Sequence, residues 1–205
     1  MAGKLIIISS PSGGGKGTLI REVLRTCPEI ALSVSYTTRA KREGEIDGRE
    51  YHFVTTEHFE GLIAQGEFLE YAHVHGKYYG TSEKQVGELI AQGKDVILEI
   101  DVQGAEAVLA KRPEAVSIFI LPPSYSVLRS RLEARQTESP AQIDLRMKNA
   151  LEEVKHYKSF KFVVENNDLS TAVRKIKSII AGESPLEDGQ ETAVKAILEI
   201  GRAHV

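Results

Sequence analysis

A glycine-rich turn between residues 9 and 18 is the segment of this chain best suited to chemistry. It follows the apolar run 5–8 and leads into an apolar helical pattern. Glycines allow consecutive backbone N–H groups to converge on a phosphate, and the next helix adds the positive end of its dipole. Lys16 would bring a mobile positive charge to the outer phosphates of a nucleotide. We therefore predict a P-loop for a nucleoside triphosphate. Its expected ligands are Ser12, Gly13, Gly14, Gly15, Lys16, Gly17 and Thr18.

The turn departs from the common G-x-x-x-x-G-K-[ST] pattern at two positions. Ser10 stands where the first glycine is expected, and Gly17 stands where a hydroxyl would normally reach Mg²⁺. Because Mg²⁺ is often held mainly by water and substrate phosphates, the missing hydroxyl does not exclude its use. From this segment alone, a glycine-rich turn without a ligand is the alternative.

A second polar segment, residues 33–79, is too rich in arginine and tyrosine for a simple connection. Arginine can grip a phosphate through two N–H groups, and neighbouring tyrosine hydroxyls can add hydrogen bonds. The segment therefore suits the phosphate of a nucleoside monophosphate. A solvated basic loop with surface tyrosines is the alternative that the composition leaves open.

A third group of cations lies around residues 129–146. Arg131 and Arg135 are four residues apart on a predicted helix and so share one face. Like charges at this spacing destabilise a helix unless an anion lies between them. The pair therefore indicates a further anion-binding surface.

The composition restricts the remaining options. Hydrophobic residues make up 41% and charged residues 27% of the 205, which is ordinary for a globular domain, and the net charge of −3 gives no reason to expect nucleic acid or a membrane as partner. The six histidines show no metal-ligand spacing, and the single cysteine, Cys27, excludes an intramolecular disulfide. No apolar stretch approaches a membrane span, and residues 1–4 lead directly into a strand, so we expect no signal peptide and a cytoplasmic protein.

The elements that must position these residues alternate between strands and helices. After the first strand, further strands are expected at residues 32–37, 95–100, 116–121 and 160–164. Helices are expected at 18–25, 56–65, 82–92, 126–135, 140–157 and 169–181, with Gly66 and Gly93 ending two of them. This alternation predicts an α/β fold with a mostly parallel five-stranded core sheet. Residues 182–189 suggest a linker, and 191–200 an amphipathic helix that either packs on the domain or joins another copy, so a homo-oligomer is left open.

Four further sequence words carry a resemblance to the bacterial-type guanylate kinases, from about residue 4 to about residue 181. They are Ser-Val-Ser-x-Thr-Thr-Arg at 33–39, Gly-Glu-x-x-Gly-x-x-Tyr-x-Phe at 44–53, Tyr-Tyr-Gly-Thr at 78–81 and Glu-Ile-Asp-Val-Gln-Gly at 99–104. The words occur in the order that the family shows. Together they are far more specific than the glycine-rich turn.

The resemblance implies a binding site for GMP. Its expected phosphate ligands are Arg39, Arg42, Tyr51 and Tyr79, its guanine ligands are Glu70 and Asp101 with Ser35 and Thr81, and Glu45 is a further acidic member that would orient an arginine. The carboxylates suit the base chemically, because guanine presents N1–H and N2–H₂ as donors and a carboxylate only accepts. Adenine presents a bare N1 there and would leave the acceptors unpaired.

The resemblance also implies an ATP site and a lid. Arg131, Arg135 and Arg146 would close on the phosphates of ATP, and Asn166 would meet its adenine. The expected reaction is ATP + GMP = ADP + GDP by direct in-line transfer, with Mg²⁺ entering as Mg·ATP and held mainly by phosphates and water. Lys16, Arg39, Arg135 and Arg146 would be the catalytic residues.

A single P-loop domain with three layers is expected over residues 1–205. Its core would comprise about 1–35, 89–126 and 149–181, with a GMP-binding region at about 36–88, a lid at about 127–148 and a C-terminal segment at 182–205. Two other functions stay open: a non-catalytic interaction module of the same fold, and a kinase for another nucleoside monophosphate. The lysine and arginines argue against the first, and Glu70 and Asp101 argue against the second.

Overall fold

The computed structural model describes residues 2–74, 76–134, 140–183 and 194–199. The chain separates into two compact units. The first unit comprises residues 1–5, 28–98 and 103–115, and the second comprises 6–27, 99–102 and 116–205. The predicted division into core, GMP-binding region and lid stays a prediction.

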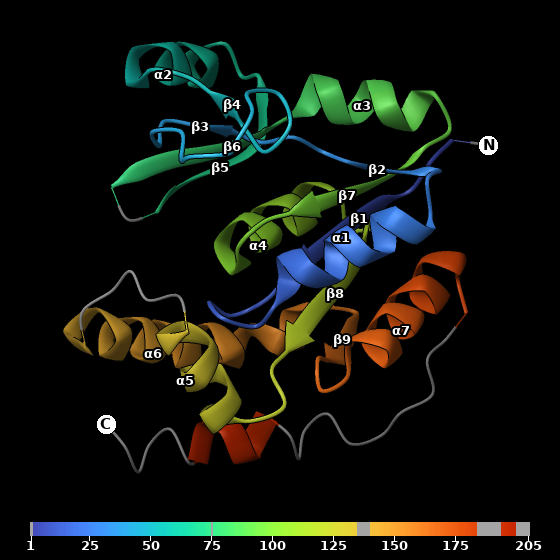
Figure 1. The fold of residues 1–205 in the computed structure, drawn as a ribbon. Helices are drawn as coiled ribbons and strands as arrows, with labels where there is room; N and C mark the ends of the chain where they lie inside the picture. Colours follow the sequence, from blue (N-terminus) through green and yellow to red (C-terminus); the bar gives the residue numbers. More distant parts are fainter. Residues whose placement is uncertain (1, 75, 135–139, 184–193, 200–205) are drawn as a thin grey trace. The chain divides into compact units, whose positions relative to one another are not determined.

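A five-stranded sheet provides the core that the sequence predicts (Figure 1). In spatial order its strands are β2 (Ile30–Leu32), β7 (Asp95–Glu99), β1 (Leu5–Ser9), β8 (Val116–Leu121) and β9 (Phe162–Glu165). The pairs β2–β7, β1–β8 and β8–β9 are parallel. The α/β fold with a mostly parallel five-stranded sheet is therefore confirmed.

The central strands are buried along their whole length. Ile6, Ile7 and Ile8 of β1 are fully inaccessible, and so are Ile118, Phe119 and Ile120 of β8. Such continuous apolar runs are typical of parallel strands covered on both faces. The last strand begins at Phe162, two residues later than predicted, and a short 3₁₀ turn at His156–Ser159 precedes it.

Four helices described in the second unit have nine or more residues. They are α1 (Lys16–Thr26), α5 (Tyr125–Glu133), α6 (Pro140–Lys155) and α7 (Leu169–Ala181), and α1 and α7 lie side by side (Figure 1). Ser124 and Asp168 accept hydrogen bonds from the backbone N–H groups of Val127 and Thr171 and so cap α5 and α7. These capped ends fix where the loops that follow β8 and β9 end.

The single strand predicted at residues 32–37 is wrong. Strand β2 ends at Leu32, and β3 (Tyr36–Thr37) belongs to a second sheet of order β4-β3-β6-β5. The other members are β4 (His52–Phe53), β5 (Phe68–Val74) and β6 (Lys77–Ser82). The backbone passes from one sheet to the other between β2 and β3: Ser33 N–H still donates to Ile97 of β7, while the Ser35 carbonyl accepts from His52 of β4.

Helix α2 (Thr56–Ala64) packs on the second sheet through aromatic rings. Phe59 is fully buried and stacks on Phe68 at 4.5 Å and on Tyr78 at 5.1 Å between ring centroids. A Cβ atom at Gly80 would lie 2.9 Å from Phe59 and 3.0 Å from Phe68, so only glycine fits beneath these rings.

Helix ends in the first unit follow the predicted glycine signals. Gly66 and Gly93 take φ angles of 70° and 81° just beyond α2 and α3 (Glu83–Ala91), which confirms both as helix-ending residues. Helix α4 (Val102–Lys111) was not predicted. Its buried residues Val102, Ala105 and Val108 have helical spacing, but part of that segment also forms a polar sequence word.

Residues 194–199 of the predicted C-terminal helix are helical, with Val194 and Ile197 buried. This favours packing within the second unit over association with another copy. The predicted linker lies outside the described residues beyond 183. Within the described ranges, no helix has the length and apolar character needed to cross a membrane.

Candidate functional site

The glycine-rich turn of the second unit has the backbone geometry of a phosphate-binding loop. Gly13 and Gly15 take φ angles of 85° and 89°, in the left-handed region that favours glycine. Gly14 N–H donates to Pro11 at 2.9 Å and closes the turn, and α1 begins at Lys16, immediately after Gly15. The N-terminus of an eleven-residue helix therefore opens onto the turn.

Lys16 is held at the carboxyl end of β7. Its Nζ donates to the Ile100 carbonyl at 2.7 Å. A Cβ atom at the neighbouring Gly17 would lie 3.3 Å from the Glu99 carboxylate, so a larger residue there would crowd this carboxylate. Thr18 is exposed, and its hydroxyl accepts from Arg21 at 3.3 Å. A carboxylate rather than a hydroxyl thus lies beside the position where P-loops usually carry Ser or Thr.

Arg131 and Asn166 brace the phosphate-binding turn from α5 and from the end of β9. The Arg131 guanidinium donates to the carbonyls of Gly14 at 3.2 Å and Asn166 at 3.1 Å. Asn166 Nδ2 also donates to Gly14 at 2.9 Å, and its side chain is buried against Gly15. Burial lowers the pKa of Arg131. The structure thus brings Arg131 and Asn166 to the phosphate-binding turn, whereas the resemblance implied a phosphate contact for Arg131 and an adenine contact for Asn166.

Helix α6 holds the start of the same turn through two side chains. Arg146 donates to the Ser12 hydroxyl from Nη2 at 2.9 Å, and the Glu153 carboxylate accepts from Ser12 N–H at 2.8 Å. The sequence predicted Arg146 as a phosphate ligand, and the structure brings it to the loop. No sequence pattern pointed to Glu153, which lies 141 residues from its partner Ser12.

In the first unit, the predicted GMP-phosphate residues gather around Arg39. Arg39 makes a two-pronged ion pair with Glu45, with N–O distances of 2.7 and 3.0 Å. Glu45 also accepts from the backbone N–H of Arg42 at 2.7 Å. The hydrogen bond from Arg39 is the main cause that lowers the pKa of Glu45 to about 2, and the pKa of Arg39 is raised in return. Glu45 therefore orients Arg39, as predicted for an acidic member of the site.

Two tyrosines of the predicted clamp lie beside this ion pair. The Arg39 guanidinium carbon lies 5.3 Å from the Tyr51 ring centroid and 5.6 Å from that of Phe53. The rings of Tyr51 and Tyr79 meet edge to face at 5.9 Å. Arg42 is exposed, and its backbone N–H donates to Glu45. Arg39, Glu45, Tyr51 and Tyr79 thus form one cluster within the first unit.

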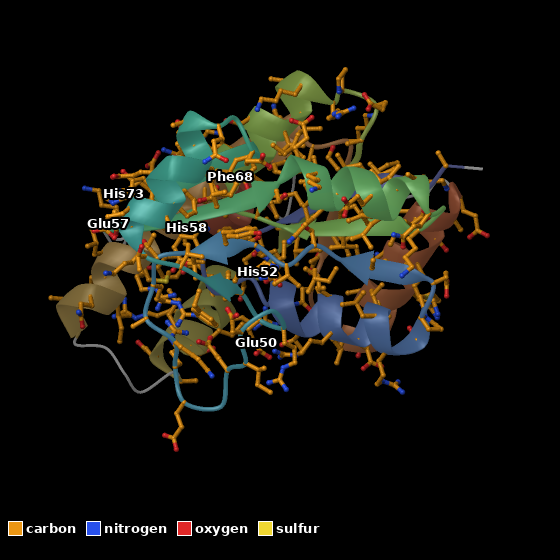
Figure 2. The ribbon with its side chains drawn as sticks, turned by 90° about the horizontal axis from the view of Figure 1, so that it is seen from above. Glu50, His52, Glu57, His58, Phe68 and His73 are labelled. Atoms are coloured by element: carbon orange, nitrogen blue, oxygen red, sulfur yellow. The ribbon has the colours of Figure 1, made fainter. Side chains whose placement is uncertain are left out.

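The predicted guanine ligands Glu70 and Thr81 face each other across β5 and β6. Thr81 Oγ1 lies 2.6 Å from Glu70 Oε1, and both residues are buried. A hydroxyl that donates to this carboxylate fixes one oxygen. On the same sheet, Tyr36 packs between His52 and Phe68, both labelled in Figure 2, with ring centroids 4.7 and 5.8 Å away.

Comparison with known proteins identifies the family. The guanylate kinase family profile matches residues 2–183. The chain is 46% identical over 198 residues to the guanylate kinase of Dechloromonas aromatica (strain RCB), covering 97% of this chain and 98% of the relative, and 48% identical to that of Aliivibrio fischeri (strain ATCC 700601 / ES114), covering 96% of each. The crystal structure of guanylate kinase from Anaplasma phagocytophilum is similar with a TM-score of 0.74 and 35% identity, over 88% of this chain and 86% of that one.

The chain belongs to the guanylate kinase family. The predicted resemblance is thereby confirmed.

Three residues of the predicted guanylate kinase site remain to be located. Ser35 is half-buried before β3, and its carbonyl accepts from His52. Asp101 belongs to the second unit and follows β7, whereas Glu70 and Thr81 belong to the first. Arg135 lies outside the described residues. The cluster of Arg39, Glu45, Tyr51 and Tyr79 therefore lies in the first unit, and the phosphate-binding turn lies in the second.

The carboxylates at the carboxyl end of β7, Glu99 and Asp101, are compatible with the Mg²⁺ that guanylate kinases typically use. Within the described ranges, no group of three or more His, Cys, Asp or Glu side chains could hold a metal ion alone. Glu99 offers a hard oxygen donor beside Gly17, at the first turn of α1. This donor set fits a cation whose other ligands are water and nucleotide phosphates.

Proposed function

We propose that the protein transfers the γ-phosphoryl group of ATP reversibly to GMP, giving ADP and GDP. The observation that carries this proposal is the match to guanylate kinases over nearly the whole length of both chains. The enzyme is a phosphotransferase. The site residues below are part of the same proposal and rest on the geometry of each unit.

The second unit binds ATP. Backbone N–H groups of the turn and the N-terminus of α1 receive the phosphates. Lys16 exchanges its contact with the Ile100 carbonyl for the outer phosphates, and Arg131, Arg146 and Arg135 add positive charge around them. Asn166 contributes to the adenine end.

The first unit binds GMP. Arg39, oriented by Glu45, presents its remaining N–H groups to the phosphate, together with Arg42 and the hydroxyls of Tyr51 and Tyr79. Glu70 accepts from the guanine N–H groups, with Thr81 holding its other oxygen. Ser35 completes guanine recognition in this unit, and Asp101 is the further guanine ligand that the resemblance implies.

Catalysis consists mainly of alignment and electrostatic stabilisation. Phosphoryl transfer passes through a loose transition state, so it needs no covalent intermediate on the protein. The acceptor phosphate is ionised near neutral pH, because its second pKa is about 6, so it needs no general base. Glu99 and Asp101 would hold Mg²⁺ through water, and the ion would supply charge neutralisation at the β- and γ-phosphates. Lys16 and the arginines supply the rest of the positive charge.

The test is ADP formation by the purified chain with Mg·ATP and each of GMP, AMP, CMP and UMP. We expect turnover with GMP and little with the other three, because the carboxylates would be left unpaired by other bases. Turnover that prefers another nucleotide would overturn the assignment of the base ligands. A folded protein that is silent with all four would overturn the enzymatic function.

A further inference from the structure

Lys111 is the last residue of α4, and none of the sequence words or predicted sites includes it. Its Nζ donates a hydrogen bond of 2.5 Å to the carbonyl oxygen of Leu69, the residue before Glu70. Lys111 and Leu69 belong to the same unit although they are 42 residues apart. A charged donor on a neutral backbone carbonyl next to a substrate ligand requires an explanation.

Leu69 is the irregular residue of strand β5. The pairing of β5 with β6 passes from Phe68 opposite Ser82 directly to Glu70 opposite Thr81, so Leu69 is an extra residue that forms a β-bulge. Bulges re-aim the side chains that follow them, and they often lie beside functional sites. Leu69 itself is buried, and its side chain contributes to the core.

The bulge sets the position of Glu70. With the extra residue in place, Glu70 lies directly opposite Thr81, and the 2.6 Å hydrogen bond between their side chains can form. The carbonyl of Leu69 belongs to the peptide group that joins Leu69 to Glu70. A donor that fixes this carbonyl therefore fixes the plane of the peptide from which Glu70 projects.

We propose that Lys111 is a positioning residue for guanine recognition: its ammonium group holds the Leu69 carbonyl and thereby the bulge that aims Glu70. The inference rests on the proposed function, in which Glu70 accepts from guanine. Lys111 touches no substrate in this assignment. A cation at the end of a helix also stabilises the helix dipole, so the test must separate this general effect from positioning.

The test uses the full chain with Lys111→Met, which keeps the apolar stem and removes the donor, and Lys111→Arg, which keeps a charged donor. The matched control is Arg112→Met, which removes a cation from the same helix end, where Arg112 pairs with Glu83 at 3.0 Å. Kinetics are measured with GMP, with ATP, and with inosine monophosphate, which lacks the N2 amino group. GMP binding without ATP is measured by calorimetry, and folding by thermal unfolding.

For Lys111→Met we expect about a tenfold rise in KM and Kd for GMP, the size of one charge-assisted hydrogen bond. The kcat and the KM for ATP should stay within about twofold, because the second unit is untouched. The preference for GMP over inosine monophosphate should fall, since a misplaced Glu70 loses its advantage at N2. Lys111→Arg should restore most of the GMP affinity, and Arg112→Met should resemble wild type.

The outcomes separate this inference from the proposed function. A wild-type chain that does not phosphorylate GMP would defeat the proposed function itself. If the wild type phosphorylates GMP, then a Lys111→Met variant with unchanged GMP affinity and unchanged base preference overturns the inference. Equal losses in Lys111→Met and Arg112→Met also overturn it, because a helix-end charge would then explain both.

Discussion

Two arginines, one in each unit, differ in the groups that hold their guanidinium side chains. Arg39 is gripped by the Glu45 carboxylate through two hydrogen bonds. Arg131 donates to the backbone carbonyls of Gly14 and Asn166, and within the part of the chain that the structure describes it has no carboxylate partner. The pKa of Arg39 is accordingly raised by its ion pair, whereas burial lowers that of Arg131.

These partners give the two arginines different roles toward a phosphate: one side chain is held in a fixed orientation, and the other attracts the anion more strongly. A carboxylate compensates the charge of Arg39, so this side chain is fixed in place before an anion arrives but attracts it less strongly. Arg131 is partly desolvated and its partners are neutral carbonyl oxygens, so its positive charge attracts an incoming phosphate more strongly. We therefore expect Arg39 to act mainly through alignment and Arg131 mainly through affinity. The following predictions test this contrast.

The largest effect should come from Arg39→Gln. Loss of one oriented donor set costs about 100- to 1,000-fold in turnover, and Glu45 would lose the partner that holds it. Steady-state kinetics with varied GMP and saturating ATP should show this loss mainly in kcat. Arg49→Gln is the control, because Arg49 pairs with Glu50 on the surface of the same segment. A loss confined to KM would contradict the alignment role.

The next largest effect should come from Arg131→Met. We expect about a 10- to 100-fold weaker apparent affinity for ATP, with GMP affinity unchanged. ATP binding measured by calorimetry, together with the KM for ATP, would show it. The control is Arg129→Met on the same helix, since Arg129 pairs with Glu133 and Asp144 at the surface. If kcat fell while ATP affinity stayed at the wild-type value, the contrast between the two arginines would fail.

Thr81→Val tests how a neutral partner stabilises a buried anion, the Glu70 carboxylate. The buried Glu70 carboxylate is held by a neutral hydroxyl, and removing that donor should lower the free energy of unfolding by about 1–3 kcal/mol. Denaturant unfolding measures the change. Thr81→Ser keeps the hydroxyl and should retain most of the stability, and equal losses in both variants would argue for lost packing instead.

The smallest effect is the acid sensitivity of the Arg39–Glu45 pair. The pKa of Glu45 is lowered from 4.5 to about 2, so the stability that its charge contributes is fully present above about pH 4.5 and is lost as the pH falls towards 2. Glu45→Gln should therefore lower the free energy of unfolding at pH 7 by less than about 1 kcal/mol, because both partners are partly exposed. The difference from wild type should shrink at about pH 3.

Urea unfolding at the two pH values measures this difference, with Glu60→Gln on the exposed face of α2 as control. A difference that grows on acidification would reverse the sign and contradict the lowered pKa of Glu45.

The sequence predicted the parallel sheet because its strands are long apolar runs, and it predicted helix ends where Gly66 and Gly93 supply the left-handed backbone. It failed at the second sheet, where β5 and β6 were not predicted and where β3 and β4 contain two residues each. Strands this short carry no periodic pattern, and their positions depend on hydrogen bonds to β6 and to Ser35. Short strands held by tertiary contacts cannot be predicted from local composition.

The same distinction applies to the sites. Arg39 and Glu45 lie six residues apart, in two successive sequence words that match the family, so both could be chosen from the sequence. The contacts of Glu153 with Ser12 and of Lys111 with Leu69 join distant segments through backbone groups. Backbone partners leave no mark in residue type, so such supporting residues appear only in three dimensions.

The glycine beneath the aromatic stack has a consequence for how this family varies. Because Phe59 and Phe68 fill the space at Gly80, a methyl group fits there only if a smaller side chain replaces one of these two phenylalanines. Positions 59, 68 and 80 should therefore covary: a relative with alanine at position 80 should carry a smaller residue at position 59 or 68.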